Sequence, residues 1–147
     1  MKRSRVGYCS KYHLPKISRP RVFISYSNNN PSQVALLRNL KKAGYLDFVD
    51  YSIKEPYESR WYESAKYRIR ESDCVLLALN EYELGEGILT ELSIAESMNK
   101  PILVVRNNHY LPIPRELWNY RIRIIPFNCK SIQREFYKAH RRQFRYY

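Results

Sequence analysis

The sequence has 147 residues, of which 44% are hydrophobic, and a formal net charge of +12. This length fits one domain with a substantial hydrophobic core, and the composition is that of a globular rather than a disordered chain. Apolar runs do not exceed about eight residues, which excludes a membrane-spanning helix, and the basic amino terminus lacks the apolar segment of a secretory signal.

The cysteines and histidines lack the spacing of disulfide or metal sites. The three cysteines are odd in number and far apart, without a C-x-x-C pair, which fits a reducing cytoplasm. Cys74 stands in an apolar run and is expected to be a small core residue. The histidines have no ligand-like spacing, so we expect surface positions for His13, His109 and His140. The sequence therefore predicts a cytoplasmic protein without a bound metal.

Charge is distributed unevenly along the chain. Residues 1–20 contain six basic and no acidic residues, residues 21–105 contain ten basic and twelve acidic residues, and residues 106–147 contain ten basic and two acidic residues. A nearly neutral centre is bracketed by two basic ends, which suits an anionic partner or simple solubility. The first segment has no sustained apolar period, so we expect a basic, partly disordered arm over residues 1–20, ahead of a domain over residues 21–147.

Hydrophobic periodicity predicts strands that alternate with helices. The helix after the first strand ends at Gly44, a residue suited to the left-handed position beyond a helix. In the second strand, alternation places Leu46, Phe48 and Asp50 on one face. The predicted strands cover residues 21–27, 46–51, 74–79, 101–105 and 122–127, and the predicted helices cover residues 32–43, 60–71, 84–100, 115–120 and 131–145.

These strands have the pattern of a parallel sheet. Residues 74–79 are all apolar, as in a strand buried on both faces, and the regular alternation favours helices on both sides. We expect Trp61 and Trp118 to pack in the core or in a groove. The expected fold is α/β, a flavodoxin-like, doubly wound sheet of five parallel strands in the order 2-1-3-4-5. Its ligand crevice lies at the carboxyl ends of the first and third strands.

Glu91 has an unusual position in the predicted helix over residues 84–100. Leu84, Ile88, Ala95 and Met98 form one apolar stripe, and Glu91 falls on the same stripe. A carboxylate on this side is costly unless it has partners or a purpose, so it is either a rim residue paired with an arginine or part of a functional site. Because the helix follows the third strand directly, Glu91 should lie over the crevice.

Four segments resemble TIR domains. Val22-Phe-Ile-Ser-Tyr-Ser27 resembles their first strand, and Glu71-Ser-Asp-Cys-Val-Leu-Leu-Ala-Leu79 resembles their third strand with its approach. Glu91-Leu92, followed by Ala95 and Asn99-Lys-Pro-Ile-Leu-Val-Val105, resembles the segment that carries the catalytic glutamate. The fourth segment is similar to the TIR-like sensor proteins of Thoeris antiviral defence, and it reads Asp50-Tyr-Ser-Ile-Lys-Glu-Pro56. The resemblance covers roughly residues 21–106.

The resemblance implies an enzyme that cleaves its substrate NAD at the nicotinamide–ribose bond and needs no cofactor. In the Thoeris type, the ADP-ribosyl part becomes a cyclic or conjugated signal nucleotide that activates an effector. By position, Glu91 corresponds to the catalytic glutamate, and Ser25, Tyr26, Ser27 and Asn80 correspond to residues that line the substrate pocket. Contacts between TIR domains imply a homo-oligomer.

Two other functions stay open on the sequence. Many TIR domains assemble without catalysis, and this chain has Ile88 and Asn28 where a tryptophan and an acidic residue are common in the family. The basic and aromatic residues over 140–147 combine cations with stacking surfaces, as in nucleic-acid binding, which we consider the weaker alternative. Gly85-Glu-Gly87 is not a phosphate-binding loop because no third glycine follows. No membrane partner is expected.

Overall fold

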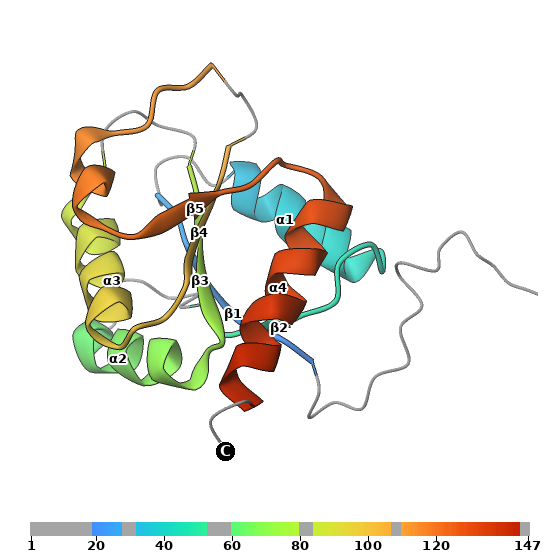
Figure 1. Ribbon diagram of the computed structural model, residues 1–147, viewed down its shortest axis with the longest axis horizontal. Coiled ribbons are helices and arrows are strands. Elements are labelled where there is room, and N and C mark those ends of the chain that lie inside the picture. The colour runs from blue at the N-terminus through green and yellow to red at the C-terminus, as the bar shows by residue number, and fades with distance from the viewer. Residues whose placement is uncertain (1–18, 28–31, 53–59, 80–83, 107–109, 145–147) are drawn as a thin grey trace, which may run out of the picture.

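A five-stranded sheet lies between two layers of helices (Figure 1). The computed structural model describes residues 19–27, 32–52, 60–79, 84–106 and 110–144. The strands are β1 (Arg21–Ser25), β2 (Val49–Asp50), β3 (Cys74–Ala78), β4 (Ile102–Val105) and β5 (Ile122–Ile124). The helices are α1 (Ser32–Lys42), α2 (Trp61–Glu71), α3 (Glu86–Ser97), the 3-10 helix η3 (Arg115–Asn119) and α4 (Cys129–Phe144).

All strand pairs are parallel and the order is β2-β1-β3-β4-β5, which confirms the predicted flavodoxin-like, doubly wound sheet. Every residue of the central strand β3 is buried, because helices cover both of its faces. In the pairing of β1 with β3, Ser25 stands opposite Leu77. The strand order reverses between β1 and β3, so the topological switch point lies at the carboxyl ends of these two strands.

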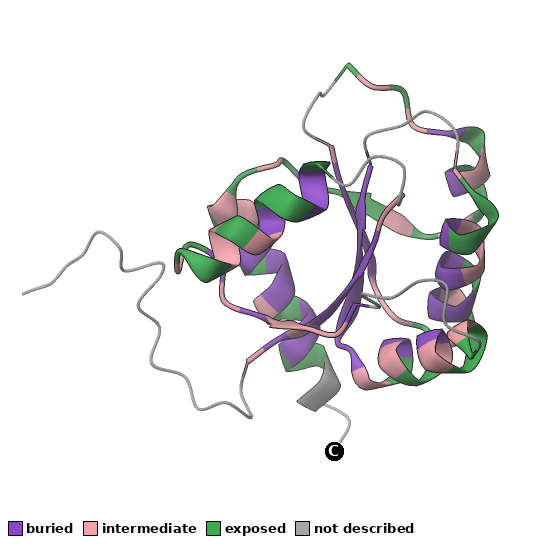
Figure 2. Cartoon of the chain, turned by 180° about the vertical axis from the view of Figure 1, so that it is seen from behind, coloured by how far each residue is buried: buried purple, intermediate pink, exposed green. Residues whose placement is uncertain are grey.

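The sheet separates two hydrophobic clusters. The α1/α4 cluster includes Val22 and Ile24, and the α2/α3 cluster includes Phe23 and Leu77. Figure 2 shows buried strands between the helical layers, with the exposed residues on the outer sides of the helices. Neighbouring residues of β1 alternate between the clusters because successive side chains of a strand point to opposite faces. The same alternation turns Ser25 toward the α2/α3 side.

Two residues in the left-handed conformation direct the chain out of helices. Gly44 follows α1 with a φ of 90°, as predicted from the preference for glycine beyond a helix. Asn99 follows α3 with a φ of 59°, and the N–H of Lys100 closes the turn on the carbonyl of Ala95 at 2.9 Å. Asparagine tolerates this conformation better than most residues do. The turn delivers Pro101 to the start of β4.

Some elements are shorter than the sequence predicts. β2 contains two residues, although Leu46 and Phe48 of the predicted strand are buried in the α1/α4 cluster. β5 ends at Ile124, two residues before Pro126, which has no N–H to continue a strand ladder. The basic arm predicted over residues 1–20 lies outside the described residues apart from its last two positions. In the described ranges, no helix combines the length and the hydropathy needed to cross a membrane.

The prediction for Trp118 was wrong, whereas that for Cys74 is confirmed. Trp118 is 72% exposed, because the tight turn of η3 buries Leu117 and leaves Trp118 outside, beside Arg115. Trp61 is half-buried against the α2/α3 cluster, as expected for a residue in a groove. Cys74 is fully buried in the core, and burial raises the pKa of its thiol. This thiol is therefore a packing element and not a nucleophile.

The surface position predicted for His140 was also wrong. His140 is buried because it continues the inward stripe of Ile132 and Phe136 at intervals of four residues along α4. Its Nδ1 is hydrogen-bonded to Oδ2 of Asp73 at 2.8 Å, and the same oxygen accepts the backbone N–H of Arg21 at 2.8 Å. This cluster joins α4 to the amino ends of β1 and β3. His13 and His109 lie outside the described residues.

Candidate active site at the carboxyl end of the sheet

Glu91 lies on the buried side of α3. Ile88, Leu92 and Ala95 of this helix pack in the α2/α3 cluster, and Glu91 shares their side with 9% of its surface exposed. Glu86, at the start of the same helix, is exposed. The inward position predicted from the helical register of Glu91 is thus confirmed. A buried carboxylate requires a compensating partner, and the structure provides one on β1.

Ser25 joins β1 to α3 through a hydrogen bond to Glu91. Its hydroxyl Oγ donates to Oε1 of Glu91 at 2.6 Å, and Ser25 itself is 1% exposed. This distance is typical of a hydroxyl bonded to a charged acceptor. Ser25 is the last residue of β1, and the alternation of the strand turns it to the side that α3 covers. The pair therefore lies at the carboxyl end of β1, next to the switch point.

Burial raises the pKa of Glu91 from 4.5 to about 7, and the hydrogen bond from Ser25 acts in the opposite direction. The low dielectric of the interior penalises the charged form more than one hydroxyl donor stabilises it. Within the described part of the chain, no lysine or arginine forms an ion pair with Glu91. The carboxyl group can therefore gain or lose a proton near neutral pH, which is the property required of a general acid or base.

The other residues predicted for the pocket have different positions. Tyr26 lies on the opposite face of the sheet, where it packs against the α1/α4 cluster. The guanidinium carbon of Arg38 lies 5.4 Å from the centroid of the Tyr26 ring. Ser27 is half-buried after the end of β1, and Asn80 lies outside the described residues. Of the residues predicted to bind substrate, Ser25 is thus the one whose contact with Glu91 is described.

Two buried polar residues at this end of the sheet were not predicted. Gln33, in the first turn of α1, donates from Nε2 to the carbonyl oxygen of Leu79, directly after β3. Ser52, after β2, accepts the N–H of Ile24 at 2.7 Å through its hydroxyl. Polar residues are common at helix starts and in loops, so nothing in the sequence around Gln33 and Ser52 predicts that they are buried. Their burial depends on contacts between segments far apart in the chain.

Asp50 and Arg38 fix the position of Ser52. Oδ1 of Asp50 accepts the N–H of Ser52 at 2.9 Å, and its Oδ2 accepts Nε–H of Arg38 at 2.9 Å. Burial alone would raise the pKa of Asp50, but the hydrogen bonds from Ser52 and Arg38 hold it below its ordinary value. Asp50 therefore stays ionised at neutral pH and serves to hold the loop after β2.

Two cavities formed by described residues lie away from Glu91. One of about 330 Å³ lies at the amino ends of β4 and β5, and one of about 370 Å³ lies against the outer side of α3, beside Tyr62. Residues 28–31 and 80–83, which continue the chain after β1 and β3, lie outside the described residues. Within the described ranges, no three His, Cys, Asp or Glu residues could hold a metal ion. The contact described at the switch point is therefore that of one titratable carboxyl group with one hydroxyl.

No protein-family profile and no curated protein matches the sequence. A CMP N-glycosidase of Clostridium botulinum has a similar structure, with a TM-score of 0.49 and 15% identity over 78% of this chain and 96% of that chain. A protein of Burkholderia pseudomallei described as pilus-assembly-related has a TM-score of 0.52 and 10% identity over 88% of this chain and 96% of that chain. At such low identity, structural similarity establishes the fold alone. The chain is therefore a flavodoxin-like α/β domain with a buried Ser25–Glu91 pair at its switch point.

Proposed function

We propose that this protein is a TIR-like enzyme that cleaves NAD at the nicotinamide–ribose bond, with Glu91 as its catalytic residue. The Ser25–Glu91 pair carries the proposal, because it combines a 2.6 Å hydrogen bond, burial and a carboxyl pKa of about 7. Ligands of doubly wound sheets bind at the switch point, which is where this pair lies. The two residues also belong to segments that resemble the first strand and the catalytic segment of TIR domains.

The reaction makes demands that a carboxylate meets. The bond between ribose C1′ and the ring nitrogen breaks, and its electron pair stays on the nicotinamide, which leaves as a neutral molecule without an acid. The positive charge passes to the ribose as an oxocarbenium ion, which an ionised carboxylate stabilises. Water then forms the new bond to C1′ and loses a proton, or a nucleophilic atom of a nucleotide does so when the product is cyclic or conjugated.

The environment of Glu91 suits it both to stabilise the positive charge on the ribose and to accept a proton from the nucleophile. With a pKa of about 7, a substantial fraction of the carboxyl groups is ionised at neutral pH. The cationic nicotinamide ring of bound NAD would increase that fraction, because an opposite charge nearby favours the carboxylate. The same group can then accept the proton of the attacking nucleophile. Ser25 acts as a positioning residue, because its hydroxyl fixes one carboxylate oxygen and leaves the other for the ribose.

The similarity to Thoeris sensor proteins extends the proposal to the product and its use. The ADP-ribosyl part would form a cyclic or conjugated nucleotide signal that activates an effector in antiphage defence. TIR-type sites often require two protomers, so we propose that the active form is a homo-oligomer. Mass spectrometry of the products of NAD turnover distinguishes ADP-ribose from a cyclic or conjugated nucleotide.

Nicotinamide release from NAD, measured by chromatography over a range of protein concentrations, tests the role of Glu91. Glu91→Gln keeps the shape of the side chain and removes its charge, so we expect activity to fall by about 10²–10³-fold, as for other preorganised electrostatic groups. Glu86→Gln is the matched control, since it removes a carboxylate from the exposed side of the same helix and should keep full activity.

Two results would contradict the proposal in different ways. Equal nicotinamide release by the wild-type protein and a folded Glu91→Gln variant would remove Glu91 from the mechanism. No release by the wild-type protein at any concentration tested would exclude NAD cleavage and favour a role in assembly without catalysis. Far-ultraviolet circular dichroism of each variant verifies that the fold is intact.

A further inference from the structure

A basic cavity lies at the end of the sheet opposite to Glu91. Its volume is about 330 Å³, and it is formed by the end of α3, the starts of β4 and β5, and one side of α4. Glu96 and Glu135 also line it, so five cationic side chains and two carboxylates give a net charge of +3. The cationic side chains are Lys100, Arg121, Arg123, Lys138 and Arg142.

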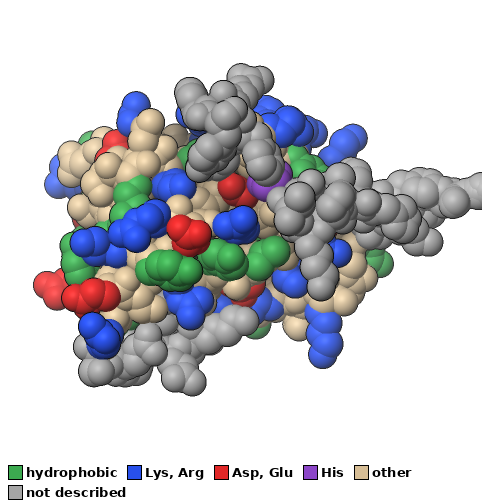
Figure 3. Space-filling model, turned by 90° about the horizontal axis from the view of Figure 1, so that it is seen from below, with side chains coloured by type: hydrophobic (Ala, Val, Ile, Leu, Met, Phe, Trp, Pro, Cys, Tyr) green, Lys and Arg blue, Asp and Glu red, His purple; other side chains and the backbone are tan. Residues whose placement is uncertain are grey.

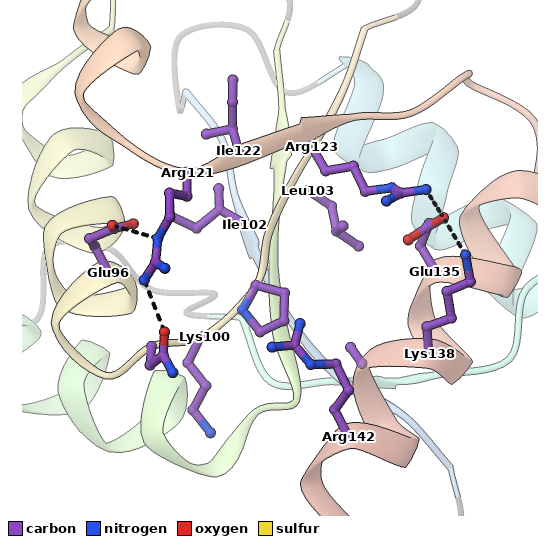
Figure 4. A pocket seen from close by; sticks show the side chains of 13 residues that line it. Glu96, Lys100, Ile102, Leu103, Arg121, Ile122, Arg123, Glu135, Lys138 and Arg142 are labelled. Atoms are coloured by element: carbon purple, nitrogen blue, oxygen red, sulfur yellow. Dashed lines mark hydrogen bonds and ion pairs between the residues drawn. The ribbon is translucent and has the colours of Figure 1, made fainter.

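Three of these cations are held in place by the protein. Arg121 pairs with Glu96 at 3.4 Å, and its Nη2 donates to Oδ1 of Asn99 at 3.0 Å. Across the cavity, Glu135 pairs with Arg123 at 3.2 Å and with Lys138 at 3.6 Å. Figure 4 shows these two groups on opposite sides of the cavity. Each guanidinium uses one or two of its five N–H donors in these contacts, so others are left for a ligand.

Arg142 differs from the other arginines of the cavity. In Figure 4 its side chain extends from α4 toward the space between the two ion-paired groups. Within the described part of the chain, no carboxylate forms an ion pair with Arg142. Lys100 points away from that space, so it adds to the positive potential without a direct contact. Arg142 is therefore the cation best placed to meet an anion that enters the cavity.

The remaining wall of the cavity is apolar. Pro101, Ile102, Ile122 and Ala139 contribute to the lining between the charged groups. Seen from below, the surface of the molecule carries Lys and Arg side chains interspersed with hydrophobic and acidic ones (Figure 3), in keeping with the basic charge of the whole chain. The apolar wall of the cavity suits the uncharged part of an organic anion better than it suits a bare ion. The cavity volume lies within the range typical of small-molecule sites.

We propose that this cavity binds a small organic phosphate, with the phosphate at Arg142 and the organic part against the apolar wall. The planar guanidinium donates two parallel hydrogen bonds to a phosphate, which gives both affinity and orientation. The carboxylates of Glu96 and Glu135 at the cavity would repel the extended backbone of a nucleic acid, whereas a single phosphate fits between them. The site is separate from Glu91 and does not depend on the function proposed for it.

Calorimetric titration with adenosine monophosphate at constant ionic strength tests this site, because the probe joins one phosphate to a flat apolar base. We expect Arg142→Gln to weaken binding about tenfold, the loss typical of a charge-assisted hydrogen bond. Arg141→Gln is the matched control, since Arg141 is exposed next to Arg142 and does not line the cavity. It should bind as the wild-type protein does. Inorganic phosphate should bind more weakly than adenosine monophosphate.

Several outcomes would overturn the proposal. The first is that adenosine monophosphate does not bind at millimolar concentration. The second is that Arg142→Gln and Arg141→Gln weaken its binding equally. The third is that Glu91→Gln weakens its binding and Arg142→Gln does not. Inorganic phosphate that binds as tightly as adenosine monophosphate would remove the role of the apolar wall. Binding of a single-stranded oligonucleotide without binding of the mononucleotide would assign the surface to nucleic acid. Thermal unfolding of each variant separates loss of the site from loss of the fold.

Discussion

Two buried carboxyl groups lie at opposite ends of the sheet in different surroundings. Asp73 is 6% exposed, and its Oδ2 accepts the N–H of Arg21 and is hydrogen-bonded to His140, both at 2.8 Å. Glu91 is 9% exposed, and its described hydrogen-bond partner is the hydroxyl of Ser25. The two carboxyl groups are therefore buried to a similar extent, but they have different hydrogen-bond partners. An acid among fixed donors supports the architecture, whereas an acid with one hydroxyl partner is available for chemistry.

The largest effect that we expect is a change with pH in the free energy of unfolding, caused by the titration of Glu91. Its pKa is 4.5 when unperturbed and about 7 in the fold, so between these values the folded protein keeps a proton that the unfolded chain has lost. The stability from this group is full below the unfolded pKa and is lost as the pH rises through the folded pKa, by about 3 kcal/mol.

Urea unfolding of the wild-type protein and of Glu91→Gln at several pH values measures this contribution. The glutamine does not titrate, so the variant should gain stability relative to the wild-type protein between about pH 5 and about pH 8. Above that range, the difference should become constant. A difference that does not change with pH would contradict the raised pKa of Glu91.

A somewhat smaller effect is expected at the other end of the sheet. Asp73→Ala removes the acceptor shared by Arg21 and His140, and we expect the free energy of unfolding to fall by about 2–3 kcal/mol. Glu63→Ala removes an exposed carboxylate from α2 and should change stability by less than about 0.5 kcal/mol. Activity per folded molecule should be unchanged in both variants. A loss of activity at full stability would place Asp73 in the chemistry.

The smallest effect is expected for Ser25→Ala. The hydrogen bond from Ser25 lowers the pKa of Glu91, so its loss should raise that pKa further. We expect the rising limb of nicotinamide release against pH to move up by roughly one unit, with about fivefold less activity at neutral pH and recovery at higher pH. Ser93→Ala, on the exposed side of α3, serves as control. An equal loss at every pH would mean that Ser25 acts by another route.

The sequence predicts the fold because its signals are local and consistent. The apolar run from Cys74 to Leu79 identifies the central strand, and the alternation of strands with helices restricts the topology to a doubly wound sheet. The inward position of Glu91 was also predictable, since helical register alone places it beside Ile88 and Ala95. The strand order also placed the end of the first strand at the same crevice, but the hydrogen bond between Ser25 and Glu91 was not predicted.

The positions that could not be predicted depend on tertiary contacts. Tyr26 stands in a segment expected to line the pocket, but the alternation along β1 turns it to the face opposite Ser25. Gln33 is an ordinary polar residue in a helix start until the fold brings it to Leu79. His140 is different, because its spacing from Ile132 and Phe136 marked it as an inward residue of α4. There the available signal was outweighed by the general tendency of histidine to lie at the surface.

The place of α4 in the core affects the chain during its synthesis. Both β1 and β3 are synthesised before Cys129, but Ile132, Phe136 and Ala139 of α4 complete the α1/α4 cluster. A nascent chain that stops ahead of this helix exposes the apolar side of the sheet over Val22 and Ile24. Such a surface promotes aggregation and recruits chaperones. Premature termination in this part of the message would thus yield an insoluble product and not a weakened protein.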